Sequence, residues 1–298
     1  MSIIISDSVD GKPPKVNQDY QTTFTVSETE IKGVIVADGI GSSAFAELAS
    51  NVVSEDVKQS FESMKKEDKI DFVNFFSKAH DSVLAYAKTN HPDCEDTSAF
   101  GTTLLVCAET EFDFQLAYIG NGAIFHLRGN FFKFSDSYIL PWNTVVNYLN
   151  PHCEPNSKGK SALYKNFSLH TEKKYVVPTT HTISKDKMYG DIFLLVTDGI
   201  YSVDEDVSKI SQFNDPTKAE EKRTAYLPIT PAYKMIIKNL KQVFNSYKEL
   251  DSDLIKNVVL NSLNVMKDEE IIDVDATIGI IISDDFLNYH KSTSVNES

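Results

Sequence analysis

Aspartates stand at the ends of apolar, strand-like segments in distant parts of the chain. Asp38 directly follows the run Val34–Ala37, Asp198 follows the run Ile192–Thr197, and Asp275 comes just before a third apolar run. Hard divalent cations select oxygen ligands, and Mg²⁺ keeps several waters while taking one or two carboxylates. These residue types therefore allow a Mg²⁺ or Mn²⁺ site, provided that the fold brings the strand ends together.

The same aspartates also allow a simpler interpretation. Asp38 and Asp198 are each followed by glycine, and a single Asp-Gly pair is more often only a turn, because both residues favour turn conformations. Two such pairs, each directly after an apolar strand, favour a shared function. Asp19 and Asp273 are further carboxylates beside predicted strands.

Composition limits the classes of function. The chain of 298 residues has 29 basic and 43 acidic residues, a formal net charge of −14 that would repel a nucleic acid backbone. Most of this acidity serves solubility. No apolar run approaches the roughly 20 residues needed to cross a bilayer, and the first residues lack an export signal. Three scattered cysteines indicate neither disulfides nor a thiolate site. We expect a cytoplasmic protein with no nucleic acid or membrane partner.

The elements that must position the aspartates follow from apolar spacing. Residues 32–37 form a predicted buried strand, and helical spacing runs from Phe45 to Phe61, with Ser42 or Ser43 as its cap, and again from Phe72 to Tyr86. Further strands are predicted over residues 102–108, 112–119, 123–128 with a continuation into 131–134, 191–197 and 277–282, and two helices over 235–244 and 254–263.

The order of these elements predicts the fold class. Strands, two helices, a block of strands, two helices and a strand do not alternate as a doubly wound sheet requires. Antiparallel sheets flanked by helical pairs fit better. Residues 135–190 are interpreted as further strands and surface loops, residues 204–231 as a polar loop, and the residues after Asp285 as a polar tail.

The order of short motifs resembles the metal-dependent protein phosphatases, the type-2C or PPM family, in a bacterial-like branch. Any one motif is weak, whereas six in the family's order are specific. They are Asn17-Gln18-Asp19, Val36-Ala37-Asp38-Gly39-Ile40-Gly41-Ser42-Ser43, Gly101-Thr102-Thr103, Ile119-Gly120-Asn121-Gly122, Leu195-Val196-Thr197-Asp198-Gly199-Ile200 and Asp275-Ala276-Thr277-Ile278.

The resemblance implies an α+β, four-layer αββα sandwich over residues 1–285, with a flap-like insertion at about 204–231 and a polar tail at 286–298. It implies hydrolysis of phosphoserine and phosphothreonine in proteins, with two Mn²⁺ or Mg²⁺ ions as cofactors and a Ser/Thr kinase system as a partner. Asp38 and Asp198 would be catalytic. The metal ligands would be Asp19, Asp38, the Gly39 carbonyl, Asp198 and Asp275.

The chain departs from the family pattern in several places. Val274 stands where the last motif has its metal-binding aspartate, and Asp275 follows it; a shift of one residue would bring Asp275 into use. Asn121 and Ser202 replace aspartates that serve a third, weaker metal in relatives. Lys15 is the nearest substitute for a missing phosphate-binding arginine, although a solvated lysine is an equal interpretation.

Two other functions have to be weighed. The departures allow a pseudophosphatase, a module that keeps the fold and binds phosphoproteins or regulates without turnover. The segment Gly39–Ala44 also satisfies a dinucleotide-binding pattern. In that fold a second parallel strand with an acidic residue must follow the helix, whereas Glu55 and Asp56 lie inside the first predicted helix and another helix follows. A dehydrogenase is therefore disfavoured.

Overall fold

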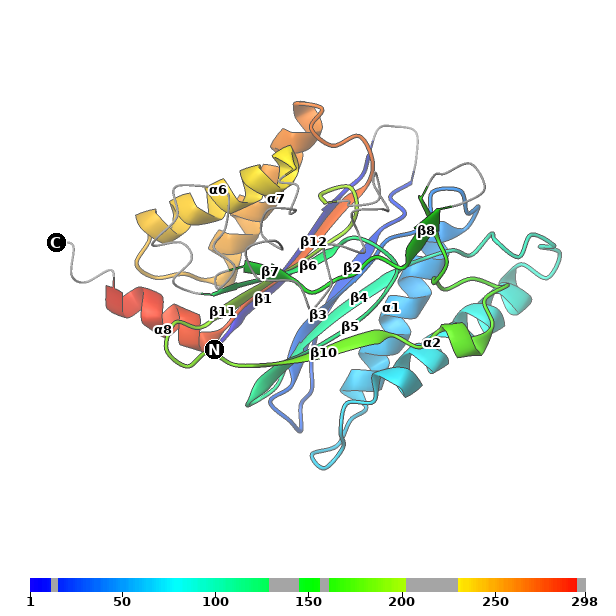
Figure 1. Cartoon of the computed structure of the whole chain (residues 1–298), viewed down its shortest axis with the longest axis horizontal. Coiled ribbons are helices and arrows are strands. Elements are labelled where there is room, and N and C mark those ends of the chain that lie inside the picture. Colours follow the sequence, from blue (N-terminus) through cyan, green and yellow to red (C-terminus); the bar gives the residue numbers. More distant parts are fainter. Residues whose placement is uncertain (12–15, 129–144, 156–160, 202–229, 294–298) are drawn as a thin grey trace.

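Two antiparallel sheets stack face to face, and a pair of helices covers the outer face of each sheet (Figure 1). This computed structural model describes residues 1–11, 16–128, 145–155, 161–201 and 230–293. The architecture is α+β with four layers, ordered helices, sheet, sheet, helices, which confirms the predicted fold class. No described helix is long and apolar enough to cross a membrane.

One sheet carries the first helical pair, α1 (Ala46–Glu62) and α2 (Phe72–Asn90). The apolar faces of both helices pack on this sheet through a cluster that includes Val53, Phe61 and Phe76. Its strands, in spatial order, are β10 (Thr179–Ser184), β5 (Asp113–Ile119), β4 (Leu104–Glu109), β3 (Lys32–Ala37) and β2 (Tyr20–Thr25).

The second sheet carries α6 (Pro231–Ser246) and α7 (Ser252–Asp268) on its outer face. Its strands, in spatial order, are β1 (Ile3–Val9), β12 (Ala276–Ile282), β11 (Asp191–Val196), β6 (Ala123–Arg128) and β7 (Val145–Asn147). The remaining described elements are the hairpin β8 (Cys153–Pro155) and β9 (Ser161–Leu163), the short 3-10 helix η1 (Lys173–Tyr175) and the helix α8 (Asp284–Thr293).

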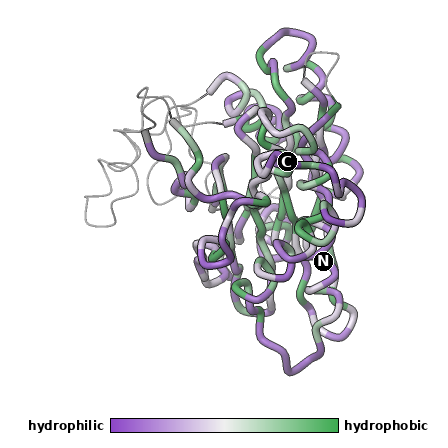
Figure 2. The backbone as a smooth tube through the Cα atoms, turned by 90° about the vertical axis from the view of Figure 1, so that its right-hand side faces the viewer, coloured by the Kyte–Doolittle hydropathy of each residue, from purple (hydrophilic) through white to green (hydrophobic). Residues whose placement is uncertain are grey.

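Burial on both faces explains why the central strands read as unbroken apolar runs. Side chains of a strand alternate between its faces. On β3, Val34 and Val36 face the opposite sheet, where they join a core with Phe193, whereas Ile35 and Ala37 face the helices. Figure 2 shows the hydrophobic stretches gathered in the central strands and the hydrophilic ones in the outer turns.

Several predicted elements are confirmed, among them β3, the helical pair α1 and α2, and the helices α6 and α7. The predicted cap of α1 is wrong. The helix begins after Phe45 without a side-chain cap, and the Ser43 hydroxyl instead donates to the Ser98 carbonyl at 2.6 Å. Strands β1 and β2 were not predicted. The segment interpreted as a polar tail forms α8, because Phe286 is buried against the second helical pair.

Some predictions fall outside the described residues, namely the strand continuation at 131–134, Lys15 and nearly all of the flap-like insertion at 204–231. The registers of the described strands bring the predicted metal ligands to one edge of the sandwich. In one sheet Tyr20 pairs with Ala37, so Asp19 and Asp38 are adjacent just beyond this pair. In the other sheet Val196 pairs with Ile278, so the turn after β11 lies beside the residues that precede β12.

Candidate metal centre

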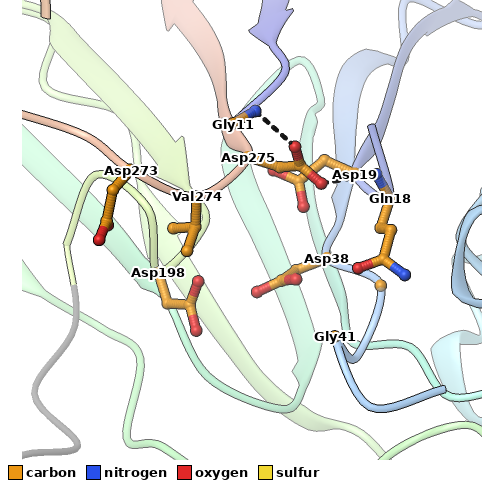
Figure 3. A pocket seen from close by; sticks show the side chains of 10 residues that line it. Gly11, Gln18, Asp19, Asp38, Gly41, Asp198, Asp273, Val274 and Asp275 are labelled. Atoms are coloured by element: carbon orange, nitrogen blue, oxygen red, sulfur yellow. Dashed lines mark hydrogen bonds between the residues drawn. The ribbon is translucent and has the colours of Figure 1, made fainter. Parts of the chain in front are cut away.

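A cavity of about 370 Å³ opens at this edge of the sandwich (Figure 3). The five residues predicted as metal ligands all line it. The complete lining consists of five aspartates, Asp19, Asp38, Asp198, Asp273 and Asp275, together with Gly11, Gln18, Gly39, Gly41 and Val274. The structure therefore brings together carboxylates that are separated by up to 256 positions in the sequence (275 − 19 = 256).

The backbone of Asp38 is held by the turn that precedes β4. Its N–H donates to the Thr103 hydroxyl at 3.1 Å, and its carbonyl accepts from the Thr102 hydroxyl at 2.9 Å and from the Thr103 N–H at 2.8 Å. The Gly101-Thr102-Thr103 motif thus serves to position Asp38. Burial, followed by the neighbouring carboxylates of Asp198 and Asp19, raises the pKa of Asp38 well above its ordinary value.

Asp19 links the two sheets. The residue is 8% exposed, and its carboxylate accepts a hydrogen bond of 2.9 Å from the hydroxyl of Thr197, which directly follows β11. The Thr197 hydroxyl in turn accepts from the Thr277 N–H at 3.0 Å. Burial raises the pKa of Asp19 to about 7, although its hydrogen bonds to Thr277 and Thr197 act in the opposite direction.

Asp198 is oriented from the loop between β5 and β6. The amide Nδ2 of Asn121 donates to Asp198 Oδ2 at 3.1 Å. Asn121 is one of the positions where the sequence departs from the pattern of the family that it resembles, which has aspartate there. A neutral amide gives Asp198 a hydrogen-bond donor, where an aspartate would place another negative charge beside it.

Both Asp-Gly pairs need their glycine for close approach between segments. A Cβ at Gly199 would lie 2.1 Å from the carbonyl oxygen of Asp275, and a Cβ at Gly39 would lie 2.5 Å from the carbonyl oxygen of Gln18. Any side chain at either position would therefore push the paired segments apart. The glycines do more than form turns, because they let the aspartates before them meet the rest of the site.

The motif that contains Asp275 differs from the three motifs that contain Asp19, Asp38 and Asp198. Asp275 lines the cavity, yet one of its oxygens accepts from the Gly11 N–H and the other from the Gln18 N–H, both at 2.7 Å (Figure 3). Its carboxylate thus ties three segments together, and each oxygen retains a lone pair for a further partner. Val274 presents a half-exposed apolar side chain to the cavity, and the Asp273 side chain points away from the other carboxylates.

The donor set fits hard divalent cations. Its carboxylate oxygens, with the nearby Gly39 carbonyl, are the ligands that Mg²⁺ and Mn²⁺ prefer. Among the described residues, no three Asp, Glu, His or Cys side chains surround one point as a closed single-ion site would. A pair of cations that keep most of their waters needs only one or two carboxylates each. Burial and neighbouring carboxylates raise the pKa values of Asp19 and Asp38, so a bound cation would offset an unfavourable accumulation of negative charge.

Sequence reasoning missed three residues that shape the site. Thr197 and Thr277 hold Asp19, and Gln18 contributes both its backbone and its side chain to the cavity wall. Each stands next to a predicted ligand or within its motif. Their position in the motifs was therefore the available signal, whereas their hydrogen-bond partners depend on how the sheets stack.

The sequence matches the model of the family described as protein phosphatase 2C over residues 12–227. No match was found among curated proteins.

Solved bacterial phosphatases share the fold. A bacterial serine phosphatase is 14% identical, covers 94% of this chain and 96% of its own, and has a TM-score of 0.60. Stp1 from Staphylococcus aureus is 15% identical, with 95% of each chain covered and a TM-score of 0.55. PstP/Ppp from Mycobacterium tuberculosis is 15% identical, with 94% and 98% covered and a TM-score of 0.53. At these identities the likeness concerns the fold alone.

The pKa of Asp19 predicts how the stability of the metal-free protein depends on pH. Its ordinary value is 3.8, and the folded value is about 7. Between these values the folded state keeps a proton that the unfolded state has lost, so the free energy of unfolding in EDTA falls as pH rises, by at most about 1.4 kcal/mol per pH unit for one proton. Urea unfolding at about pH 5 and about pH 7.5 measures this slope.

Asp19→Asn is the matched variant for that measurement. Because the variant has no proton to lose at this position, its stability should fall less steeply over the same pH range. A wild-type slope equal to the slope of Asp19→Asn would contradict the raised pKa of Asp19. Added Mn²⁺ should stabilise the wild type most at the higher pH, since cation binding requires ionised carboxyls.

Proposed function

This chain belongs to the protein phosphatase 2C family of metal-dependent serine/threonine phosphatases, and we propose that the cavity around Asp38 is its active site. One observation carries the proposal. Asp19, Asp38 and Asp198 come from three separate segments and line one cavity in which burial and mutual proximity raise carboxyl pKa values. Perturbed carboxyls gathered in a cleft are typical of functional sites.

We assign the metal ligands as follows. Asp38, the Gly39 carbonyl and Asp198 would hold two Mn²⁺ or Mg²⁺ ions, and Asp19 would complete the site directly or through water. Asp275 is available through its remaining lone pairs, although its backbone partners make it the most constrained of the set. When bound, the cations supply activation of a water molecule and stabilisation of the charge on the phosphoryl group.

The protein's own residues prepare the site for that chemistry. A hydrogen bond from the Thr197 hydroxyl orients the carboxylate of Asp19, and a hydrogen bond from the Asn121 amide orients that of Asp198. Asp19 and Asp38 must release protons for cation binding, because their pKa values are raised. No hydroxyl, thiol or imidazole is present among the described residues of the lining. This composition suits direct transfer of the phosphoryl group to water, without a Ser, Cys or His nucleophile.

The substrate class is phosphoserine and phosphothreonine in proteins, and a Ser/Thr kinase system that produces such substrates is the expected partner. Family membership supports hydrolysis over the alternative of an inactive binding module. The phosphate-binding role proposed for Lys15 concerns a residue outside the described part of the chain.

Loss of the shared carboxylate tests the assignment of the active site. Asp38→Asn should lower kcat for p-nitrophenyl phosphate and for a phosphothreonine peptide by at least about 100-fold in Mn²⁺, because even residues behind metal ligands are worth about 10- to 100-fold. Asp253→Asn, an exposed aspartate on α7, is the matched control and should leave kcat unchanged. Full activity of Asp38→Asn, or wild-type activity that survives EDTA, would contradict the proposal.

The exposed valine in the last motif generates a second prediction. Val274→Asp adds a carboxylate to the cavity wall, and we expect it to bind Mn²⁺ about tenfold more tightly than the wild type. Isothermal titration calorimetry measures the affinity. Val274→Asn, with nearly the same shape and no charge, should change it much less. Equal affinities for the two variants would show that this position does not face the cations.

A further inference from the structure

Gln18 has an unusual place among the described residues that line the cavity. It carries the one side chain with N–H donors, whereas the other polar side chains there are five aspartates. In Figure 3 the Gln18 amide lies beside Asp38 and above Gly41. A phosphate dianion that enters this cavity has several acceptor oxygens, and carboxylates offer them only repulsion until cations are bound.

The backbone of Gln18 is fixed independently of its side chain. Its N–H donates to Asp275 Oδ2 at 2.7 Å, and its carbonyl accepts from the Ser50 hydroxyl of α1 at 2.7 Å. Gly39 lies directly against this backbone and against the Gln18 Cβ. The backbone of Gln18 is therefore held by Asp275 at the edge of the second sheet, by Gly39 at the edge of the first sheet, and by Ser50 of α1. A change confined to its amide should leave the wall of the cavity in place.

The amide end of Gln18 is available for a ligand. Within the described part of the chain it makes no hydrogen bond, and the side chain is only partly buried. A Cβ built on Gly41 would meet only Gln18 Oε1, at a contact distance of 3.8 Å, so room for about one methyl group lies between Gly41 and the amide. The amide can rotate to present its NH₂ end, since its oxygen and nitrogen have nearly the same shape.

We propose that Gln18 binds the phosphoryl group of the substrate by donating a hydrogen bond to one of its non-bridging oxygens. This inference rests on the proposed function, because it concerns the same cavity. A neutral amide suits the position, since it donates to the phosphoryl group without competing for the cations as a carboxylate would. A hydrogen bond to a charged acceptor is worth about 10- to 100-fold in binding.

A purely structural role predicts different behaviour. If the Gln18 side chain only filled space, Gln18→Glu would retain function, because glutamate has almost the same shape. If the side chain served the cations through oxygen, Gln18→Glu would bind Mn²⁺ more tightly and keep its affinity for phosphate. If Gln18 instead donates a hydrogen bond to the phosphoryl group, Gln18→Glu should lose affinity for phosphate at least as strongly as Gln18→Ala. The carboxylate removes the hydrogen-bond donor and adds repulsion.

The test is calorimetric binding of inorganic phosphate to the full chain saturated with Mn²⁺. We expect Gln18→Ala to raise the Kd for phosphate about 10- to 100-fold, Gln18→Glu to raise it further, and neither variant to lose affinity for Mn²⁺. Gln59→Ala, an exposed glutamine on α1, is the matched control and should behave as the wild type. Equal unfolding temperatures in EDTA would show that the variants are folded.

Phosphate affinities of both Gln18 variants within about twofold of the wild type would overturn the inference, as would a wild type that binds Mn²⁺ but no phosphate. Turnover of p-nitrophenyl phosphate by the same proteins separates this outcome from failure of the proposed function. If the wild type binds phosphate through Gln18 but does not hydrolyse the ester, the result contradicts the proposed phosphatase activity and supports the hydrogen bond from Gln18. If both Gln18 variants hydrolyse the ester at the wild-type rate, the result supports the phosphatase activity and contradicts the hydrogen bond.

Discussion

The burial of closely spaced carboxylates is the constraint on which the structure depends. Asp19 and Asp38 sit where burial and nearby charge oppose ionisation, so the metal-free fold holds them at a cost in free energy. Divalent cations would remove this cost, because they bind the ionised form. The site is therefore built for a ligand that supplies positive charge, and the sandwich supplies the rigidity that keeps the carboxylates together without it.

Each sheet contributes to one side of the site, and hydrogen bonds between the sheets hold the sides in register. Thr197 of the second sheet reaches Asp19 of the first, and Asp275 of the second sheet accepts from the backbone of Gln18. The glycine after Asp198 lets its turn touch the Asp275 backbone. The proposed site thus depends on packing between the sheets, since a small change in their stacking would separate the aspartates.

The sequence predicted those parts of the fold and site that are local. Strand β3 and the paired helices follow from apolar spacing, and Asp38 and Asp198 from their place at strand ends. Strand β1 was missed because its middle residues are polar and only partly buried, and α8 because one buried phenylalanine anchors an otherwise polar segment. The partners of Asp19 and the backbone contacts of Asp275 depend on strand register and on the stacking of the sheets, which composition and spacing do not encode.

We propose that segments distant in the sequence bind a pair of divalent cations through shared carboxylate oxygens. Anomalous diffraction at the manganese edge, from crystals of the full chain grown with Mn²⁺, tests it most directly. We expect two peaks in the cavity, both within ligand distance of Asp38 and one of them beside Asp198. Crystals without a peak at Asp38, or with manganese bound only elsewhere on the acidic surface, would contradict it.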